Sequence, residues 1–181
     1  QSVCKEIKKE LEVADLYESV RPRIVALSTI QTVHKLISSA PNLDELLPRL
    51  ARLVLKVLKA RRCSIFMDGS KKDFLINNVT VDIDSPKKVR RQKKVWLGHG
   101  LIGKMAKTGT PVLRKNFLGA PMIDEEIIGA IVVTKNRNED PFTSLDREIL
   151  TTFTEQAVVA LKNARLYAEQ EKLTIGAIKT I

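Results

Sequence analysis

The residue types that most often carry catalysis or bind metals are few in this chain and lie far apart. There are two cysteines, Cys4 and Cys63, and two histidines, His34 and His99. The cysteines form no Cys-x-x-Cys pair, so neither a zinc site nor a disulfide framework is indicated. No Ser-His-Asp set, Cys-His set or carboxylate pair stands out. We therefore expect a protein that is not an enzyme and that needs no metal or cofactor.

A glycine-rich turn is the strongest candidate for a binding element. Gly98 and Gly100 would allow a sharp turn from a strand into a helix, and Gly103 would let that helix lie close to a sheet. Backbone N–H groups at the start of such a helix can hold an anion. The segment is therefore either one wall of a ligand pocket or a tight turn with close packing. Its spacing is not the G-x-G-x-x-G of dinucleotide-binding proteins.

The net charge of +10 raises the question of nucleic-acid binding. The charge is partly local, because six of the eight residues from position 87 to 94 are basic. No aromatic side chains are interleaved there for stacking on bases. Lysines on an exposed strand edge also prevent unwanted strand pairing. A solvated strand edge or loop is favoured over a nucleic-acid groove.

No stretch approaches the ~20 apolar residues of a membrane span, and the N-terminus lacks the apolar core of a signal peptide. We expect a protein of the reducing cytoplasm that makes no contact with a membrane. The chain starts without Met and stops at Ile181 within a predicted helix, so it is interpreted as a piece of a longer protein.

Hydrophobic periodicity predicts helices at both ends and strands between them. Apolar residues spaced by three and four before position 40 are typical of a helix that packs on one partner helix. A second helix follows over 43–58, with Asn42 as N-cap. Short strands are predicted at 62–67, 74–79, 95–97, 111–113, 117–123 and 127–134, with a short helix at 101–106. A long helix closes the chain, with Ser144 as its N-cap.

This order of elements predicts an α/β (α+β) fold with a central, six-stranded, mostly antiparallel sheet, helices on one face, and long N- and C-terminal helices. Several segments in this order also resemble the GAF domain family: the helix and first strand at 43–66, the stretch from Gly98 to Val112, the strands at 117–122 and 127–131, and the helix entry at 142–146. The resemblance divides the chain into an N-terminal helical dimerisation region (1–40), a GAF domain (41–166) and a C-terminal signalling helix (167–181).

The resemblance implies a small-molecule sensor with its ligand between the sheet and the helix at 101–106. By family topology, the expected ligand-binding residues are Trp96, His99, Leu101, Ile102, Lys115 and Phe117. Two features depart from the family. Only Arg114, Lys115 and Asn116 stand where a longer lid segment usually covers the pocket. The signature of the cyclic-nucleotide members survives only as Lys135, Phe142 and Asp146, which we expect to tie the last strand to the closing helix.

The resemblance also implies a homodimer whose terminal helices carry the signal to an output domain in the same polypeptide. The expected dimer-interface residues are Leu27, Ile30, Ile37, Phe153, Ala157, Ala160 and Ala164. The ending at 176–181 resembles the entry to an HD-type phosphohydrolase, with a histidine kinase or cyclase as the next candidates. Two alternatives remain: a ligand-free GAF scaffold that only dimerises, and a basic regulator that contacts nucleic acid.

Overall fold

The computed structural model describes residues 3–5, 7–10, 12, 31, 35, 42–69, 73–85 and 93–179. Within the described residues from 42 onward, the chain forms one sheet and three helices. The strands are β1 (Arg62–Asp68), β2 (Phe74–Asp82), β3 (Lys94–Trp96), β4 (Val112–Arg114), β5 (Phe117–Asp124) and β6 (Glu126–Thr134). The helices are α2 (Leu43–Leu58), α3 (Gly100–Thr108) and α4 (Ser144–Lys179).

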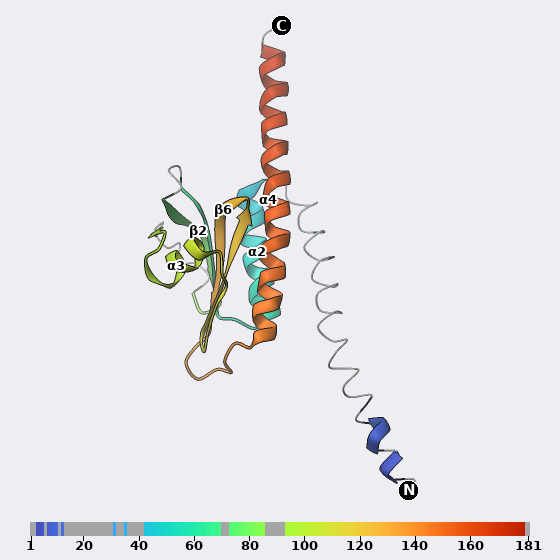
Figure 1. Cartoon of the computed structure of the whole chain (residues 1–181). Coiled ribbons are helices and arrows are strands. Elements are labelled where there is room, and N and C mark those ends of the chain that lie inside the picture. The colour runs from blue at the N-terminus through green and yellow to red at the C-terminus, as the bar shows by residue number, and fades with distance from the viewer. Residues whose placement is uncertain are drawn as a thin grey trace.

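The strands lie in the order β3-β2-β1-β6-β5-β4, and every neighbouring pair is antiparallel. The predicted six-stranded antiparallel sheet and the long C-terminal helix are confirmed. The expectation that the helices share one face is wrong for α3. The helices α2 and α4 cover one face, and α3 covers the other (Figure 1). Because each strand alternates its side chains, the sheet has an apolar layer on both faces.

The helix α2 begins where Asn42 caps it. The side-chain oxygen of Asn42 accepts a hydrogen bond from the backbone N–H of Glu45 at 3.0 Å, as the sequence predicts. Glu45 does not complete a reciprocal cap, because its carboxylate pairs with Arg49 one turn later. The helix buries one face on the sheet, formed by Leu46, Leu47, Leu50, Ala51, Val54, Leu55 and Leu58. A left-handed Lys59 (φ 48°) ends it.

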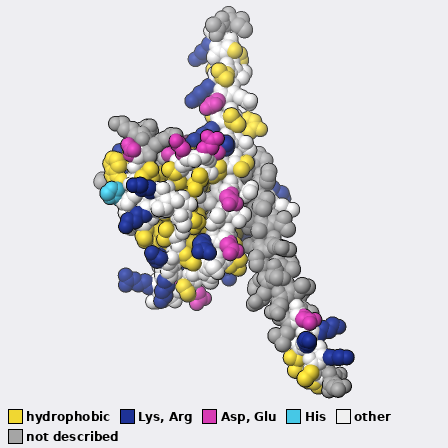
Figure 2. Space-filling model, in the orientation of Figure 1, with side chains coloured by type: hydrophobic (Ala, Val, Ile, Leu, Met, Phe, Trp, Pro, Cys, Tyr) yellow, Lys and Arg dark blue, Asp and Glu magenta, His cyan; other side chains and the backbone are white. Residues whose placement is uncertain are grey.

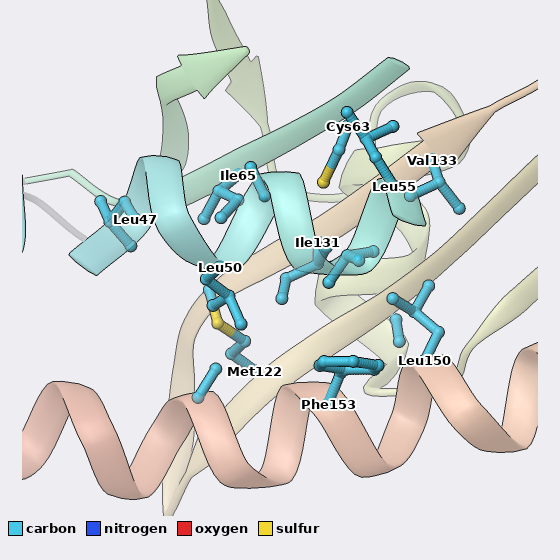
Figure 3. Packing of buried hydrophobic residues seen from close by; sticks show 14 of the residues in the cluster. Leu47, Leu50, Leu55, Cys63, Ile65, Met122, Ile131, Val133, Leu150 and Phe153 are labelled. Atoms are coloured by element: carbon cyan, nitrogen blue, oxygen red, sulfur yellow. The ribbon is translucent and has the colours of Figure 1, made fainter. Parts of the chain in front are cut away.

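The main core lies between the sheet and the pair α2–α4. Figure 3 shows Ile65 of β1, Met122 of β5 and Ile131 of β6 among side chains of both helices. A smaller core lies on the opposite face, where Phe66 of β1 and Val132 of β6 pack under α3. Adjacent residues of one strand therefore serve different layers, which holds α3 to the same sheet as α4.

The predicted N-terminal helix falls mainly outside the described residues. Within positions 1–40, the described residues are 3–5, 7–10, 12, 31 and 35, and all are helical. The predicted interface residues Leu27, Ile30 and Ile37 are not among them. Their role stays a prediction.

Candidate functional site

The glycine-rich turn before α3 is built for close packing. Gly98 (φ 83°) and Gly100 (φ 64°) have the left-handed backbone that glycine adopts without strain. The backbone N–H of Gly98 donates to the carbonyl of Gly103 at 2.7 Å, which folds the turn back onto the helix. A Cβ on Gly103 would overlap the carbonyl oxygen of Trp96. A tight turn and close packing account for all three glycines, and a role in a ligand pocket stays a prediction.

Side chains fill the space between α3 and the centre of the sheet. Met105 of α3 is 1% exposed and packs on the small core under that helix. It also lies so close to β5 that a Cβ on Gly119 would stand 2.8 Å from its sulfur. Ile102 and Phe117 are half-buried against the same cluster. The part of the predicted ligand region beneath Ile102 and Met105 is therefore packed with the chain's own residues, whereas a cavity remains at the end of α3.

The six predicted ligand-binding residues differ in how deeply they are buried in the described part of the chain. Trp96 is 56% exposed on the edge strand β3, with its ring edge-on to Phe74 at a centroid distance of 5.3 Å. His99, Leu101 and Lys115 are also exposed. Ile102 and Phe117 contribute to the core beneath α3. None of the six lines any of the three cavities described below.

The short segment between β4 and β5 is a tight turn. Its two residues, Lys115 and Asn116, close against the loop between β6 and α4. The carbonyl of Lys115 accepts from the N–H of Phe142 at 3.0 Å, and that of Asn116 accepts from the N–H of Lys135 at 3.1 Å. These two hydrogen bonds therefore tie the β4–β5 turn to the loop that leads into α4.

The three surviving residues of the cyclic-nucleotide signature form a structural tie, as expected. The ammonium of Lys135 lies 4.5 Å from the centre of the Phe142 ring and donates to the carbonyl of Asp140. Phe142 is buried in the main core. Asp146 caps the start of α4 through Thr143. Together they fix the loop that leads from β6 into α4.

Two cavities lie near the far end of α3. The first, of about 460 Å³, lies between the end of α3 and the β5–β6 hairpin. Its lining consists of Leu97, Ala106, Lys107, Thr108, Gly109, Ile123, Glu126 and Ile127. The second, of about 310 Å³, lies against α4 and shares Gly109 and Ile123 with the first. Ile123 is 46% exposed although it belongs to a strand otherwise buried at its centre.

Two ion pairs hold α4 at the place where it leaves the domain. Lys162 pairs with Asp124 of the β5–β6 turn at 2.7 Å, and Arg165 pairs with Asp68 at the end of β1 at 3.3 Å. The hydrogen bond to Asp124 raises the pKa of Lys162. Acidic side chains gather beside this point (Figure 2), and a third cavity of about 390 Å³ lies among them. We call these two ion pairs the α4 neck.

The first half of α4 belongs to the domain core, which corrects the predicted dimer interface. Phe153, Ala157 and Ala160 are at most 2% exposed and belong to the main core of this chain. Figure 3 shows Phe153 pointing from α4 into that core. These three residues have no surface left for a second chain. Ala164 is half-buried at the neck. Apolar residues at the helical period show that one face of a helix is buried. They do not show whether the same chain or a second chain covers that face.

Beyond the neck, α4 projects from the domain (Figure 1). We call residues 166–179 the projecting half. It carries exposed apolar side chains at Leu166, Tyr167, Leu173, Ile175 and Ile178. Val159, which is 48% exposed, extends one of these faces back onto the domain.

Sequence reasoning missed the residues of the two cavities beside Gly109. Glu126 belongs to a charged turn between two predicted strands, and Gly109 follows a short predicted helix. Glu155 and Thr154 were hidden inside the amphipathic pattern of the closing helix. The one available signal was Ile123, an apolar residue next to a charged turn.

The fold and the packing define an α/β domain with helices on both faces of an antiparallel sheet. A family model described as "GAF domain" matches residues 42–161. The chain belongs to the GAF domain family, whose members are sensory and regulatory signalling modules. A search of curated protein sequences found no match.

Several solved structures resemble this chain in fold. The GAF domain of an Acinetobacter phosphoenolpyruvate-protein phosphotransferase has a TM-score of 0.66 at 20% identity, covering 77% of this chain and 94% of that one. The A. aeolicus nlh2 GAF domain in an inactive state has a TM-score of 0.63 at 14% identity, covering 78% and 98%. Free methionine-R-sulfoxide reductase from Neisseria meningitidis has a TM-score of 0.66 at 10% identity, covering 78% and 90%.

The described residues offer little for chemistry of their own. Among them, no group of three or more His, Cys, Asp or Glu side chains could hold a metal ion. Cys63 is fully buried, and burial raises the pKa of its thiol, so the thiol stays neutral. Within the same part of the chain, no helix is long and apolar enough to cross a membrane. GAF domains are typically regulatory and non-catalytic.

Proposed function

We propose that this chain is a homodimeric sensory module that binds a small molecule and passes the resulting change through α4 to an output domain in the same polypeptide. The observation that carries the proposal is the continuity of α4. It is a single helix of 36 residues, with one half in the core and the other projecting from it. Any shift of the core against α4 would be transmitted along a rigid rod.

A second copy of the chain is the proposed partner of the projecting half. Val159, Leu166 and Leu173 are exposed and lie seven residues apart, so they form one stripe along the helix. A seven-residue repeat of this kind is the period at which two helices pack along their length. This stripe replaces Phe153, Ala157 and Ala160 as the proposed interface on α4.

The α4 neck is the proposed point of transmission. Asp124 and Ile123 are neighbours in β5, so the same turn holds Lys162 of α4 and lines the cavity at the end of α3. A ligand that moves the β5–β6 turn would therefore change the support of α4. A hundredfold preference of the ligand for one position of the helix supplies about 2.7 kcal/mol toward that position.

The dimer is tested by the molar mass in solution, from size-exclusion chromatography with light scattering. We expect twice the chain mass for the unmodified protein and a single chain mass for a Leu166→Glu, Leu173→Glu variant, because two carboxylates would be buried in the seam. Ile175→Glu is the matched control, since nine residues at 100° each place Ile175 on the opposite side of the helix from Leu166. A monomeric unmodified protein would contradict the proposed dimer.

A ligand-free scaffold is the second candidate, and two observations favour it: the two-residue turn between β4 and β5, and the packing of Met105 under α3. Native mass spectrometry of the purified protein distinguishes the two candidates. A dimer that carries a small adduct supports the sensor. A dimer that remains bare after addition of a metabolite extract supports the scaffold.

A further inference from the structure

The cavity against α4, here called the α4 cleft, has a chemistry of its own. Its volume is about 310 Å³, at the lower end of the range for small-molecule sites, roughly 300–1,000 Å³. One side is α4, and the other is formed by β5 and the connection from α3 to β4. Its lining consists of Gly109, Pro111, Pro121, Ile123, Thr151, Thr154, Glu155 and Val158.

The apolar part of the cleft is rigid and close to the core. Pro121 is buried in the middle of β5, and Val158 is only 8% exposed on α4. Ile123 adds an apolar side chain that is 46% exposed. Gly109 has a left-handed backbone, and a Cβ there would stand 3.2 Å from the end of Ile123. The cleft would therefore take a small apolar group in contact with both layers.

The polar part of the cleft accepts hydrogen bonds and has few to give. The Thr154 hydroxyl donates to the carbonyl of Thr151 at 2.7 Å, and the Thr151 hydroxyl donates to the carbonyl of Arg147 at 2.8 Å. Both hydroxyls have thus used their single hydrogen and keep only lone pairs. Pro111 and Pro121 have no backbone N–H, and that of Gly109 already bonds Met105.

The charge of the cleft is negative although the chain is strongly basic. No Lys or Arg is among its lining residues, while Glu155 contributes an exposed carboxylate. Within the part of the chain that the structure describes, Glu155 has no ion pair or side-chain hydrogen bond. The C-terminal end of α3, which adds partial negative charge, also borders the cleft at Gly109. A ligand that donates hydrogen bonds and carries positive charge would complement this lining.

We propose that the α4 cleft is a binding site for a small organic ammonium ion with a compact apolar body. The apolar body would lie on Pro121, Ile123 and Val158, with the ammonium group at Glu155 and the lone pairs of the threonine hydroxyls. Such a site goes beyond the proposed sensor function, because it requires neither a dimer nor an output domain. Its ligand would touch α4 directly.

Two probes of the same shape test the class of ligand on the full chain: 2-phenylethylamine, which is cationic, and 2-phenylethanol, which is neutral. Titrations are followed by ¹H–¹⁵N spectra, with the backbone amides of Gly109, Ile123 and Thr154 as reporters. We expect saturable shifts of these amides with the amine and at least about tenfold weaker binding of the alcohol, because a charged hydrogen bond is lost. Equal affinity for both probes, or no shift at these amides, would overturn the proposal.

A pair of conservative variants separates Glu155 from general electrostatics. Glu155→Gln keeps the size and exposure of the side chain, so we expect the fold to be retained and the affinity for the amine to fall about tenfold or more. Glu148→Gln removes the same charge from an exposed position seven residues earlier on α4 and should leave the affinity unchanged. Equal losses in both variants would show a non-specific charge effect and refute the site. The light-scattering mass reports on the dimer independently of either result.

Discussion

At the scale of single residues, Gly103 decides how closely α3 can approach the end of β3. Its neighbours are backbone atoms, the carbonyl oxygen of Trp96 and the nitrogen of Gly98, so an added methyl group cannot be avoided by a side-chain rotation. The hydrogen bond from Gly98 to Gly103 also holds this part of the turn in place. Overlap with backbone usually costs more than overlap with a flexible side chain.

We therefore predict that Gly103→Ala lowers the free energy of unfolding by about 1–3 kcal/mol, the usual range for overpacking. Urea denaturation followed by circular dichroism measures the change. Gly176→Ala is the control, because a Cβ there meets no atom within 4 Å, and alanine favours a helix over glycine by up to about 1 kcal/mol. A Gly103→Ala protein as stable as the unmodified chain would mean that α3 can shift at no cost.

The glycines also show what the sequence could predict at this scale. A tight turn at Gly98-His99-Gly100 follows from the residue types, because few other residues adopt positive φ. The predicted ligand contacts at Trp96, His99 and Lys115 could not be inferred from the residue types alone. They rest on the topology of the family, whereas the space under α3 depends on how Met105 and Phe117 pack. Local spacing in the sequence does not show how side chains from several strands and a helix fill the space that they share.

At the scale of elements, the start of α4 is fixed by a reciprocal cap. The backbone N–H and the hydroxyl of Thr143 both donate to the carboxylate of Asp146, at 2.8 and 3.0 Å, and the N–H of Asp146 donates back to the threonine hydroxyl oxygen at 3.2 Å. The sequence predicted Ser144 as N-cap. That prediction is wrong by one residue, because the carboxylate three positions on belongs to Thr143 and not to Ser144.

The two adjacent hydroxyl residues make this cap testable by a matched pair. Thr143→Ala removes the capping oxygen, and we predict a loss of about 1 kcal/mol in the free energy of unfolding, within the roughly 0.5–2 kcal/mol range for N-caps. Ser144→Ala removes a hydroxyl at the first helical position and should cost less than half of that. Denaturant midpoints at constant m-value decide the question. A larger loss of unfolding free energy for Ser144→Ala than for Thr143→Ala would show that Ser144 is the N-cap, as the sequence predicted.

The existence and type of the elements could be predicted from the sequence, and the partners of their faces could not. The helix over 43–58 and all six strands follow from hydrophobic periodicity and turn residues. The stripe through Phe153, Ala157 and Ala160 was equally clear, yet it packs on the chain's own sheet. Burial of a stripe is a local property of the pattern, whereas the identity of what covers it depends on the topology of the whole sheet.

At the scale of the whole molecule, the two halves of α4 differ in what supports their backbone hydrogen bonds. The half before the neck is covered by α2 and the sheet, and Leu150, Phe153 and Leu161 are at most 1% exposed. The projecting half has no such cover among the described residues, and its apolar side chains are exposed. A helical segment of this length is marginal in water without a partner, since isolated helices below ~12–15 residues scarcely form.

We predict, therefore, that hydrogen exchange along α4 depends on protein concentration only beyond the neck. Amides over 150–161 should be protected at every concentration, because they open only with the core. Amides over 166–178 should gain protection as the concentration rises through the range in which light scattering reports a dimer, and the Leu166→Glu, Leu173→Glu variant should lose that gain. Protection of 166–178 that is equally high at all concentrations and in the variant would show that the helix is stabilised within one chain. In that case α4 would still be a rigid rod, but its partner would have to be sought in the same polypeptide and not in a second copy.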